Sequence, residues 1–394
     1  MPTTPLRNAA YRLRLAIPVG IPRLERYPDM TVKGGPLHFQ KSYVHLLRKH
    51  HVLGSAALLR SGLNRTVILS SSRRPEHIVT EQSLFRVASI TKMATSLCAL
   101  IAVDQGKLTL DDPITDIFRF LPECPSIPEL RGITLRHLLS HTSGLRDPES
   151  LESALNENLP FPRILPGCAV TEPGKAFRYS NLGFGLVGSL LETVYGEPVS
   201  EVFSRLLFRP LSMRATLSAA GLNPSEIVPI TRVYRYHPGK DLIMTPLGSR
   251  PVHAPDPLRH YGYTAGAMYL DLPSLERLMD CVRLKGTPLL REALGSEMIR
   301  KQAEYGSISP TLSYGLGLLR ISDPALSDSV ILGHQGFAYG CADGAFWEEN
   351  TGRMILFLNG GASEARRGRL GLCNFDLLRW ALRKEFPQWS RSGK

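Results

Sequence analysis

Three segments in the first third of the chain have apolar residues at regular spacing. Between residues 36 and 52, Phe39, Tyr43, Leu46 and Leu47 recur at helical intervals, which predicts an amphipathic helix. Two β-type runs, residues 55–59 and 66–70, flank a turn sequence at 61–64 and predict a hairpin. Residues 90–105 are apolar nearly all round and stop at Gly106, as expected for a buried helix with a glycine cap.

The remaining chain divides into a helical part and a strand part. Residues 108–301 contain short helical patterns separated by proline-rich loops, at 135–140, 186–195 and 274–284. Short β-type runs follow at 314–321, 330–333, 342–347 and 354–358, and residues 375–384 predict a closing amphipathic helix. This order predicts an α/β (α+β) fold: an antiparallel sheet built from both chain ends and flanked by helices, with a large helical lobe inserted.

These patterns predict a domain organisation. Residues 1–36, rich in proline and arginine, form an N-terminal arm that we expect to be irregular or disordered, and residues 386–394 form a tail. Residues 37–385 form one domain. Segments 37–88 and 302–385 make its α/β lobe, and segment 89–301 makes its helical lobe.

Composition narrows the class of protein. The 394 residues are 43% hydrophobic and 21% charged, which is typical of a folded globular chain. No apolar run reaches the roughly 18 residues of a membrane-spanning helix. The run at 15–21 resembles part of a signal peptide, but Pro18 and Pro22 flank or interrupt it and no small-residue cleavage site follows. Six scattered cysteines without a C-x-x-C pair favour a reduced, cytoplasmic protein, with export left open.

The net charge of +12 raises the question of nucleic-acid binding. The basic residues are dispersed, and short clusters such as 366–369 lack interleaved aromatic residues. We therefore expect no nucleic-acid partner, while affinity for anionic substrates or surfaces stays open.

Ser89 and Lys92 form an S-x-x-K motif where a β-type segment gives way to the buried helix. Residues three apart share a helix face, and a helix N-terminus favours negative charge on an attacked carbonyl. An amine in an apolar helix has a lowered pKa and becomes usable as a base. The alternative is a capping serine and a lysine that extends its amine to solvent.

Two further groups carry candidate chemistry. Tyr179 and Asn181 form Y-x-N; a tyrosine near a cationic lysine has its pKa lowered and can relay protons, and the amide can orient the lysine or bind a substrate carbonyl. His334 and Gly336 form H-x-G, where the imidazole can bind or protonate substrate and the glycine lets a ligand approach the backbone. The alternative for Y-x-N is a helix-entry tyrosine with the asparagine in a helix cap, and the alternative for H-x-G is a core histidine whose hydrogen bonds are satisfied within the protein.

Together the three motifs resemble the serine β-lactamase and penicillin-recognising peptidase superfamily. Their order is most similar to the class C β-lactamase-related branch, which includes D-stereospecific peptidases and family VIII esterases. Flanking segments spread over most of residues 37–385 also resemble this branch. They lie at 85–92, 105–113, 133–145, 265–268 and 314–318. The resemblance implies the serine β-lactamase/DD-peptidase-like fold, with the site between the two lobes.

The resemblance also implies residue roles. Ser89 is the nucleophile, Lys92 and Tyr179 share the proton transfers as a pair, and Asn181 positions them or the substrate. The backbone N–H groups of Ser89 and Phe337 form an oxyanion hole. His334, with Gly336 in the H-x-G motif, stands where true β-lactamases carry the lysine of K-T-G, which weakens the antibiotic-hydrolase interpretation because imidazole is mostly neutral at pH 7. No metal and no organic cofactor are implied.

Three competing motifs fit their contexts poorly. Residues 183–188 spell G-x-G-x-x-G, but no buried strand precedes them, as a dinucleotide site requires. His137 and His141 are spaced as helical metal ligands, yet the glutamate of H-E-x-x-H is absent and Gly144 follows closely. Residues 361–365 are a poor copy of the G-x-S-x-G elbow, and no histidine follows His334.

We therefore predict a serine hydrolase that cleaves an ester or amide, such as a carboxylester or small D-amino-acid peptide, through a Ser89 acyl-enzyme. Acyl transfer to an alcohol or amine and β-lactam hydrolysis are the enzymatic alternatives, and a catalytically silent binding or scaffold protein is the non-enzymatic one. Loops at 148–174 and 224–257 are expected to shape the pocket. The sequence does not indicate the physiological substrate or the oligomeric state.

Overall fold

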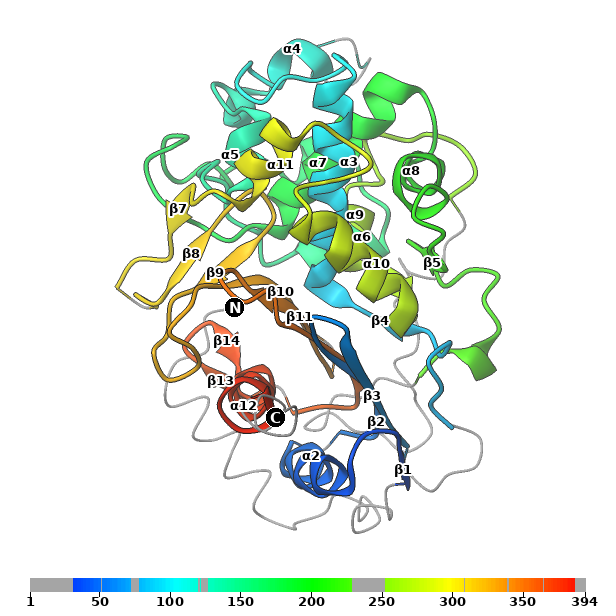
Figure 1. Ribbon diagram of the computed structural model, residues 1–394. Coiled ribbons are helices and arrows are strands. Elements are labelled where there is room, and N and C mark those ends of the chain that lie inside the picture. The colour runs from blue at the N-terminus through cyan, green and yellow to red at the C-terminus, as the bar shows by residue number, and fades with distance from the viewer. Residues whose placement is uncertain are drawn as a thin grey trace, which may run out of the picture.

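The computed structural model (Figure 1) describes residues 31–50, 52–71, 78–119, 121, 127–228, 252–307, 309–338, 340–363 and 365–386. The expected arm up to residue 30, the tail from 387 and most of the loop 224–257 lie outside these residues. Among the described residues, no helix combines the length and the apolar character needed to cross a membrane.

Short and medium helices dominate the middle of the chain. The α-helices are α2 (Leu37–Lys49), α3 (Thr91–Asp104), α4 (Thr115–Phe118), α5 (Leu135–Leu139), α6 (Leu151–Asn156), α7 (Asn181–Tyr195), α8 (Val199–Phe203), α9 (Tyr263–Gly266), α10 (Leu272–Arg283), α11 (Glu292–Ile299) and α12 (Leu372–Trp380). Short 3₁₀ turns are η2 (Ala88–Ile90), η3 (Pro128–Leu130), η4 (Phe161–Arg163) and η6 (Pro224–Glu226). Two wider turns, η5 (Ser204–Phe208) and η8 (Ala381–Glu385), extend α8 and α12.

One large antiparallel sheet combines strands from both ends of the chain. Within the described residues it has the order β1-β3-β2-β12-β11-β10-β9-β8-β7. Its members are β1 (Thr31–Lys33), β2 (Gly54–Ser61), β3 (Asn64–Ser71), β7 (Ala303–Glu304), β8 (Leu312–Tyr314), β9 (Leu319–Ile321), β10 (Ile331–Ala338), β11 (Cys341–Glu348) and β12 (Met354–Gly360). The early hairpin joins the late strands where Leu58 of β2 pairs with Leu356 of β12.

Two smaller sheets complete the strand set of the described residues. One has the order β4-β6-β5, formed by β4 (Phe85–Arg86), β6 (Tyr269–Leu270) and β5 (Ala215–Thr216). The other pairs β13 (Arg366–Arg367) with β14 (Leu370–Gly371) just before α12.

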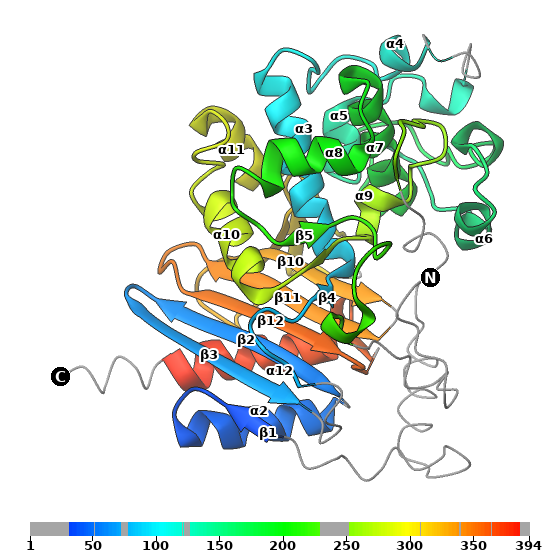
Figure 2. The same ribbon diagram turned by 90° about the vertical axis from the view of Figure 1, so that its right-hand side faces the viewer.

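The large sheet lies between two helical layers (Figure 2). Successive side chains of a strand point to opposite faces, and β2 shows this clearly. Ala56 and Leu58 pack into the core shared with α3, α7 and α10, whereas Ala57 and Leu59 pack into the core shared with α2 and α12. Both faces are therefore apolar, and β2 is nearly fully buried.

The expected fold class is confirmed, and most predicted elements are present with modest differences in length. The run at 314–321 is an exception, because β8 and β9 are separate strands with a turn between them. Gly317 in that turn has φ +71°, and a Cβ there would meet Ser96 Oγ at 1.9 Å. Helix α7 begins at Asn181, five residues before the predicted start at 186. Strand β1 lies within the expected arm and pairs with β3.

Candidate active site

Ser89 lies in the middle of η2, the short turn that connects β4 to α3. The small sheet holds this junction, because β4 pairs with β6. Ala88, just before Ser89, has φ +42°, a left-handed conformation that is costly for a residue with a Cβ. Its carbonyl accepts a hydrogen bond from Thr91 Oγ1 at 2.6 Å. A sharp, strained turn thus sets the direction in which the half-buried Ser89 side chain leaves the backbone.

Lys92 is in the first turn of α3, and its side chain is fully buried. Its Nζ lies 3.1 Å from Ser89 Oγ, 2.9 Å from Asn181 Oδ1 and 2.6 Å from the carbonyl oxygen of Ala265. Burial lowers the pKa of Lys92 to about 7, and the Asp147 carboxylate opposes that decrease. The amine is therefore available in its neutral form near neutral pH.

Tyr179 donates its phenolic hydroxyl to Ser89 Oγ at 2.9 Å. Lys92 Nζ lies over the ring of Tyr179, 4.9 Å from its centroid. We expected a lowered pKa for this phenol, but the structure indicates the opposite: burial raises the pKa of Tyr179, and the hydrogen bond to Ser89 only partly offsets it. The resting phenol is thus protonated and acts as a donor.

Asn181 is the first residue of α7, and Ser180 caps that helix by accepting a hydrogen bond from Gly183 N at 2.9 Å. The carboxylate of Asp147 accepts hydrogen bonds from the same helix start, including one from Asn181 Nδ2 at 2.9 Å. Sequence reasoning missed Asp147, because a lone aspartate in a loop has no diagnostic spacing. The position of Asn181 is thereby fixed from both sides, by Lys92 and by Asp147.

His334 lies within β10, with only 2% of its surface exposed. Its Nδ1 is 2.7 Å from the carbonyl oxygen of Gln335, which can only accept, so Nδ1 carries the proton. Burial lowers the pKa of His334 to about 3, with the nearby Lys92 adding to the effect. The neutral ring therefore accepts the hydroxyl of Tyr314 at Nε2, at 2.7 Å. Both ring nitrogens have protein partners, which differs from our expectation of a ring that faces substrate.

Gly336 and Phe337 continue the same strand, which lies against η2. A Cβ at Gly336 would meet the carbonyl oxygen of Val87 at 2.3 Å. We expected this glycine to admit a ligand, but the group that approaches it is the protein's own backbone at Val87, two residues before Ser89. The absence of a side chain lets β10 lie close to the nucleophile, with Phe337 next along the strand.

His141, considered above only as a metal ligand, is in fact part of this cluster. Its ring is stacked on Tyr179 with centroids 4.1 Å apart and is close to Tyr314 at 4.8 Å. Its Nδ1 accepts the backbone N–H of Ser180 at 3.1 Å. Burial lowers the pKa of His141 well below its usual value. The neutral ring of His141 therefore packs against the ring of Tyr179 without adding a charge beside its phenol.

The competing motifs have structural explanations. Gly185 and Gly188 lie inside α7, where a Cβ would meet Tyr261 O at 1.8 Å and Thr264 Oγ1 at 2.6 Å, so these glycines serve helix packing. His137 Nδ1 accepts the backbone N–H of Thr134 in a capping box. Ser363, in the elbow-like segment, is only 3% exposed. Within the described ranges, no group of three or more His, Cys, Asp or Glu side chains could hold a metal ion.

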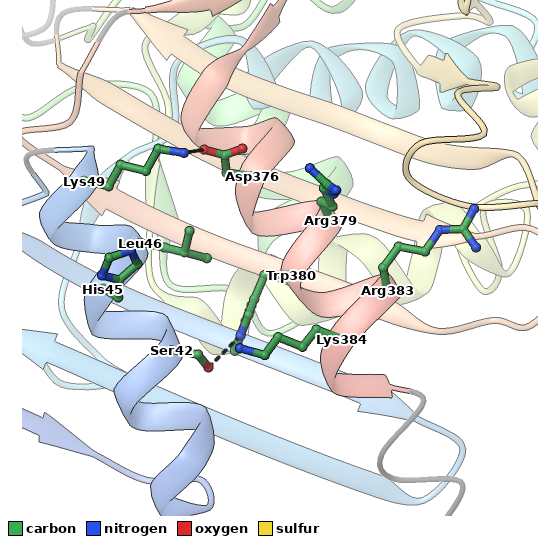
Figure 3. Close-up of a pocket in the computed structure, with 9 residues that line it drawn as sticks. All are labelled: Ser42, His45, Leu46, Lys49, Asp376, Arg379, Trp380, Arg383 and Lys384. Atoms are coloured by element: carbon green, nitrogen blue, oxygen red, sulfur yellow. Dashed lines mark hydrogen bonds and ion pairs between the residues drawn. The ribbon is translucent and has the colours of Figure 1, made fainter.

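A hollow of about 490 Å³ lies between α2 and the C-terminal helix, on the face of the sheet away from α3 (Figure 3). The hydroxyl of Ser42, which lines this hollow, donates a hydrogen bond to a backbone carbonyl of α2 and accepts one from the indole N–H of Trp380 at 2.9 Å. Its carboxylate, on Asp376, is paired with Lys49 at 2.7 Å and with His50 at 2.8 Å. These groups already have partners, and the hollow contains none of the motif residues.

Comparison with known proteins gives a consistent family assignment. A family model described as Beta-lactamase matches residues 39–370. Esterase EstB of Burkholderia gladioli is 29% identical over 375 residues, which cover 84% of this chain and 91% of that protein. The D-alanyl-D-alanine-carboxypeptidase/endopeptidase AmpH of Escherichia coli is 29% identical over 183 residues, 44% of this chain and 47% of that protein.

Solved structures support the same fold. The D-amino acid amidase from Ochrobactrum anthropi, complexed with L-phenylalanine amide, aligns with a TM-score of 0.68 at 22% identity, covering 90% of this chain and 97% of that one. EstCE1, described as a hydrolase with promiscuous acyltransferase activity, aligns with a TM-score of 0.64 at 22% identity, covering 87% and 97%.

Proposed function

This chain belongs to the β-lactamase family, and on that premise we propose that it is a serine hydrolase that cleaves ester or amide bonds through an acyl-enzyme on Ser89. One observation carries the proposal. The Oγ of Ser89 lies 3.1 Å from a buried amine, Lys92 Nζ, and 2.9 Å from a phenolic hydroxyl, Tyr179 OH. A hydroxyl held between a base and a proton donor is the arrangement that nucleophilic catalysis requires.

Acylation follows from the protonation states of these groups. Neutral Lys92 accepts the proton of Ser89 as Oγ attacks the substrate carbonyl, and a Ser89–acyl bond forms while the ester or amide bond breaks. Tyr179, protonated because burial raises its pKa, gives its proton to the leaving oxygen or nitrogen. Lys92 then returns its proton to the Tyr179 oxygen, which resets the pair.

In deacylation, Lys92 again serves as the base. Lys92 accepts a proton from water as the water oxygen attacks the acyl carbonyl, and it returns that proton to Ser89 Oγ as the acyl–oxygen bond breaks. The carbonyl oxygen gains negative charge in both steps. We assign its stabilisation to the backbone N–H groups of Ser89 and Phe337, since η2 and β10 lie side by side.

The proposed substrate is a small carboxylester or a D-amino-acid peptide or amide. Three similar proteins support this class: an esterase, a D-alanyl-D-alanine carboxypeptidase and a D-amino acid amidase. The neutral His334 disfavours a β-lactam, because its ring carries no charge to pair with the β-lactam carboxylate. Acyl transfer to an alcohol remains the alternative outcome, as EstCE1 is described as having promiscuous acyltransferase activity.

We also propose a cytoplasmic location and no nucleic-acid partner. The scattered cysteines are typical of a reduced compartment, and the basic residues form no aromatic-interleaved track. Cell fractionation followed by detection of the untagged chain tests the location; recovery in the exported fraction would contradict it.

Intact-protein mass spectrometry tests the reaction before the substrate is known. Wild type is mixed briefly with p-nitrophenyl esters or with a penicillin, beside Ser89→Ala, Lys92→Ala and the control Ser61→Ala at the hairpin turn. We expect an acyl mass on wild type and on Ser61→Ala, and none on Ser89→Ala. Added methanol that yields methyl ester instead of acid would favour the transferase alternative. If wild type gains no mass and releases nitrophenol no faster than Ser89→Ala does, the proposal fails and a binding or scaffold role gains support.

A further inference from the structure

Asp147 makes an unusually complete set of contacts at the start of α7. Its Oδ1 accepts from Ser180 Oγ at 2.9 Å and from Leu182 N at 2.9 Å. Its Oδ2 accepts from Asn181 N at 3.0 Å and from Asn181 Nδ2 at 2.9 Å. Four hydrogen bonds to three consecutive residues hold this half-buried carboxylate at a helix N-terminus, where backbone donors and the helix dipole both favour negative charge.

These contacts determine which end of the Asn181 amide faces Lys92. A carboxylate can only accept, so the amide must turn its Nδ2 toward Asp147. Its Oδ1 is then the atom 2.9 Å from Lys92 Nζ. The reverse orientation would place Oδ1 against the carboxylate and the Nδ2 donors against the amine, which is unfavourable at both ends.

The orientation of the amide in turn decides where the lone pair of Lys92 points. A neutral amine has two N–H donors and one lone pair. Its two acceptor partners, Asn181 Oδ1 and the carbonyl oxygen of Ala265, take both donors. The lone pair is left for the third neighbour, the hydroxyl of Ser89 at 3.1 Å. An amide presented with its Nδ2 would instead donate to that lone pair and remove the base.

We propose that Asp147 is a positioning residue, which fixes the Asn181 amide so that neutral Lys92 directs its lone pair at Ser89. The proposal rests on the proposed function, since it concerns the same nucleophile. Asp147 touches neither Ser89 nor any reacting atom; it acts through Asn181. It also contributes charge: among the titratable groups around Lys92, which are Tyr179, His141, His334 and Asp147, it is the one that raises the pKa of the amine.

The test compares Asp147→Asn with a matched control. Glu149→Gln removes an exposed carboxylate two residues away. The readout is the rate at which a fluorophosphonate labels Ser89, measured by intact mass between pH 5 and 9, which needs no turnover. We expect Asp147→Asn to label about 10- to 100-fold more slowly at high pH and its acid limb to move to lower pH. Glu149→Gln should keep the wild-type labelling rate and pH profile.

A double-mutant cycle separates positioning from general support of the fold. The cycle uses Asp147→Ala, Asn181→Ala and the double mutant. Asn181→Ala already removes the amide that Asp147 positions, so the double mutant should label only slightly more slowly than Asn181→Ala. Additive losses, or an unchanged rate and profile in Asp147→Asn, would overturn the positioning role and leave the proposed function intact. A wild type that is not labelled would instead overturn the proposed function, and the role of Asp147 with it.

Discussion

The Nζ of Lys92 lies 3.1 Å from the Oγ of Ser89 inside a site where the amine is completely buried. Burial, opposed by Asp147, lowers the pKa of Lys92 to about 7. A lysine that must be neutral to accept the Ser89 proton gives an activity that rises with pH as the amine deprotonates.

The first prediction concerns this rise of activity with pH, which is the acid limb of the pH profile. We expect kcat/KM for a p-nitrophenyl ester to increase through about pH 7 in wild type. Lys92→Arg keeps a positive charge but stays protonated, so kcat/KM should fall by about 10²- to 10⁴-fold. Lys107→Arg, an exposed lysine just after α3, serves as the matched control. Retention of the wild-type limb by Lys92→Arg would show that another group is the base.

The second prediction concerns conversion of H-x-G to K-x-G. His334 is buried, and both its nitrogens have partners. His334→Lys would bury a second amine close to Lys92 and leave the Tyr314 hydroxyl without its acceptor. We expect a lower Tm and no gain in hydrolysis of a chromogenic cephalosporin, whereas His334→Gln should lose less stability. A His334→Lys protein with unchanged Tm and new cephalosporin turnover would contradict this.

The third prediction concerns acid sensitivity of the fold. The pKa of His334 and of His141 is lowered in the folded state by burial. Below about pH 6.5 the unfolded chain binds protons that these folded rings do not, so the free energy of unfolding should decrease as pH falls from 6.5 toward 4. Urea unfolding at several pH values measures the slope. In His334→Gln the free energy of unfolding should depend less steeply on pH than in wild type. Equal slopes would show that His334 does not contribute to the acid sensitivity.

The fourth prediction concerns the contact of β10 with the nucleophile turn. Gly336→Ala places a Cβ 2.3 Å from the carbonyl oxygen of Val87. We expect β10 to shift away from η2, with a loss of about 1–3 kcal/mol in stability and about a 100-fold loss in kcat, because the oxyanion donors move. Gly62→Asn, at a hairpin turn with open space and φ +57°, is the control. Full activity in Gly336→Ala would show that this close approach is not needed.

Regular hydrophobic spacing was enough to predict the early hairpin, the buried helix after Ser89 and the late strands, because each of these segments packs apolar side chains into a core. Spacing could not predict the break between β8 and β9. That break depends on Gly317 fitting against Ser96, a contact between distant segments. The start of α7 was missed for a similar reason: Gly183 and Gly185 weaken its helical pattern, and the close approach of Tyr261 to the helix requires Gly185.

In the site, too, short motifs predicted some features, and features that depend on tertiary contacts were missed. The motifs identified Ser89, Lys92, Tyr179 and Asn181 as candidates, and the structure brings these side chains together. The direction of the Tyr179 pKa was wrong, because burial outweighs a neighbouring amine and no short motif reports burial. Asp147 and the stacking role of His141 were missed, since each depends on a loop returning to the start of α7.

The pairing of β2 with β12 has a consequence for how the chain is made. Strand β2 is synthesised early, yet its partner β12 lies close to the other end of the sequence. Until that partner leaves the ribosome, the hairpin has an unpaired apolar edge that invites association with other chains. Folding dominated by such distant contacts is slow. Protein shortened before residue 354 should therefore accumulate in aggregates, and co-expressed chaperones should raise the yield of the full-length chain.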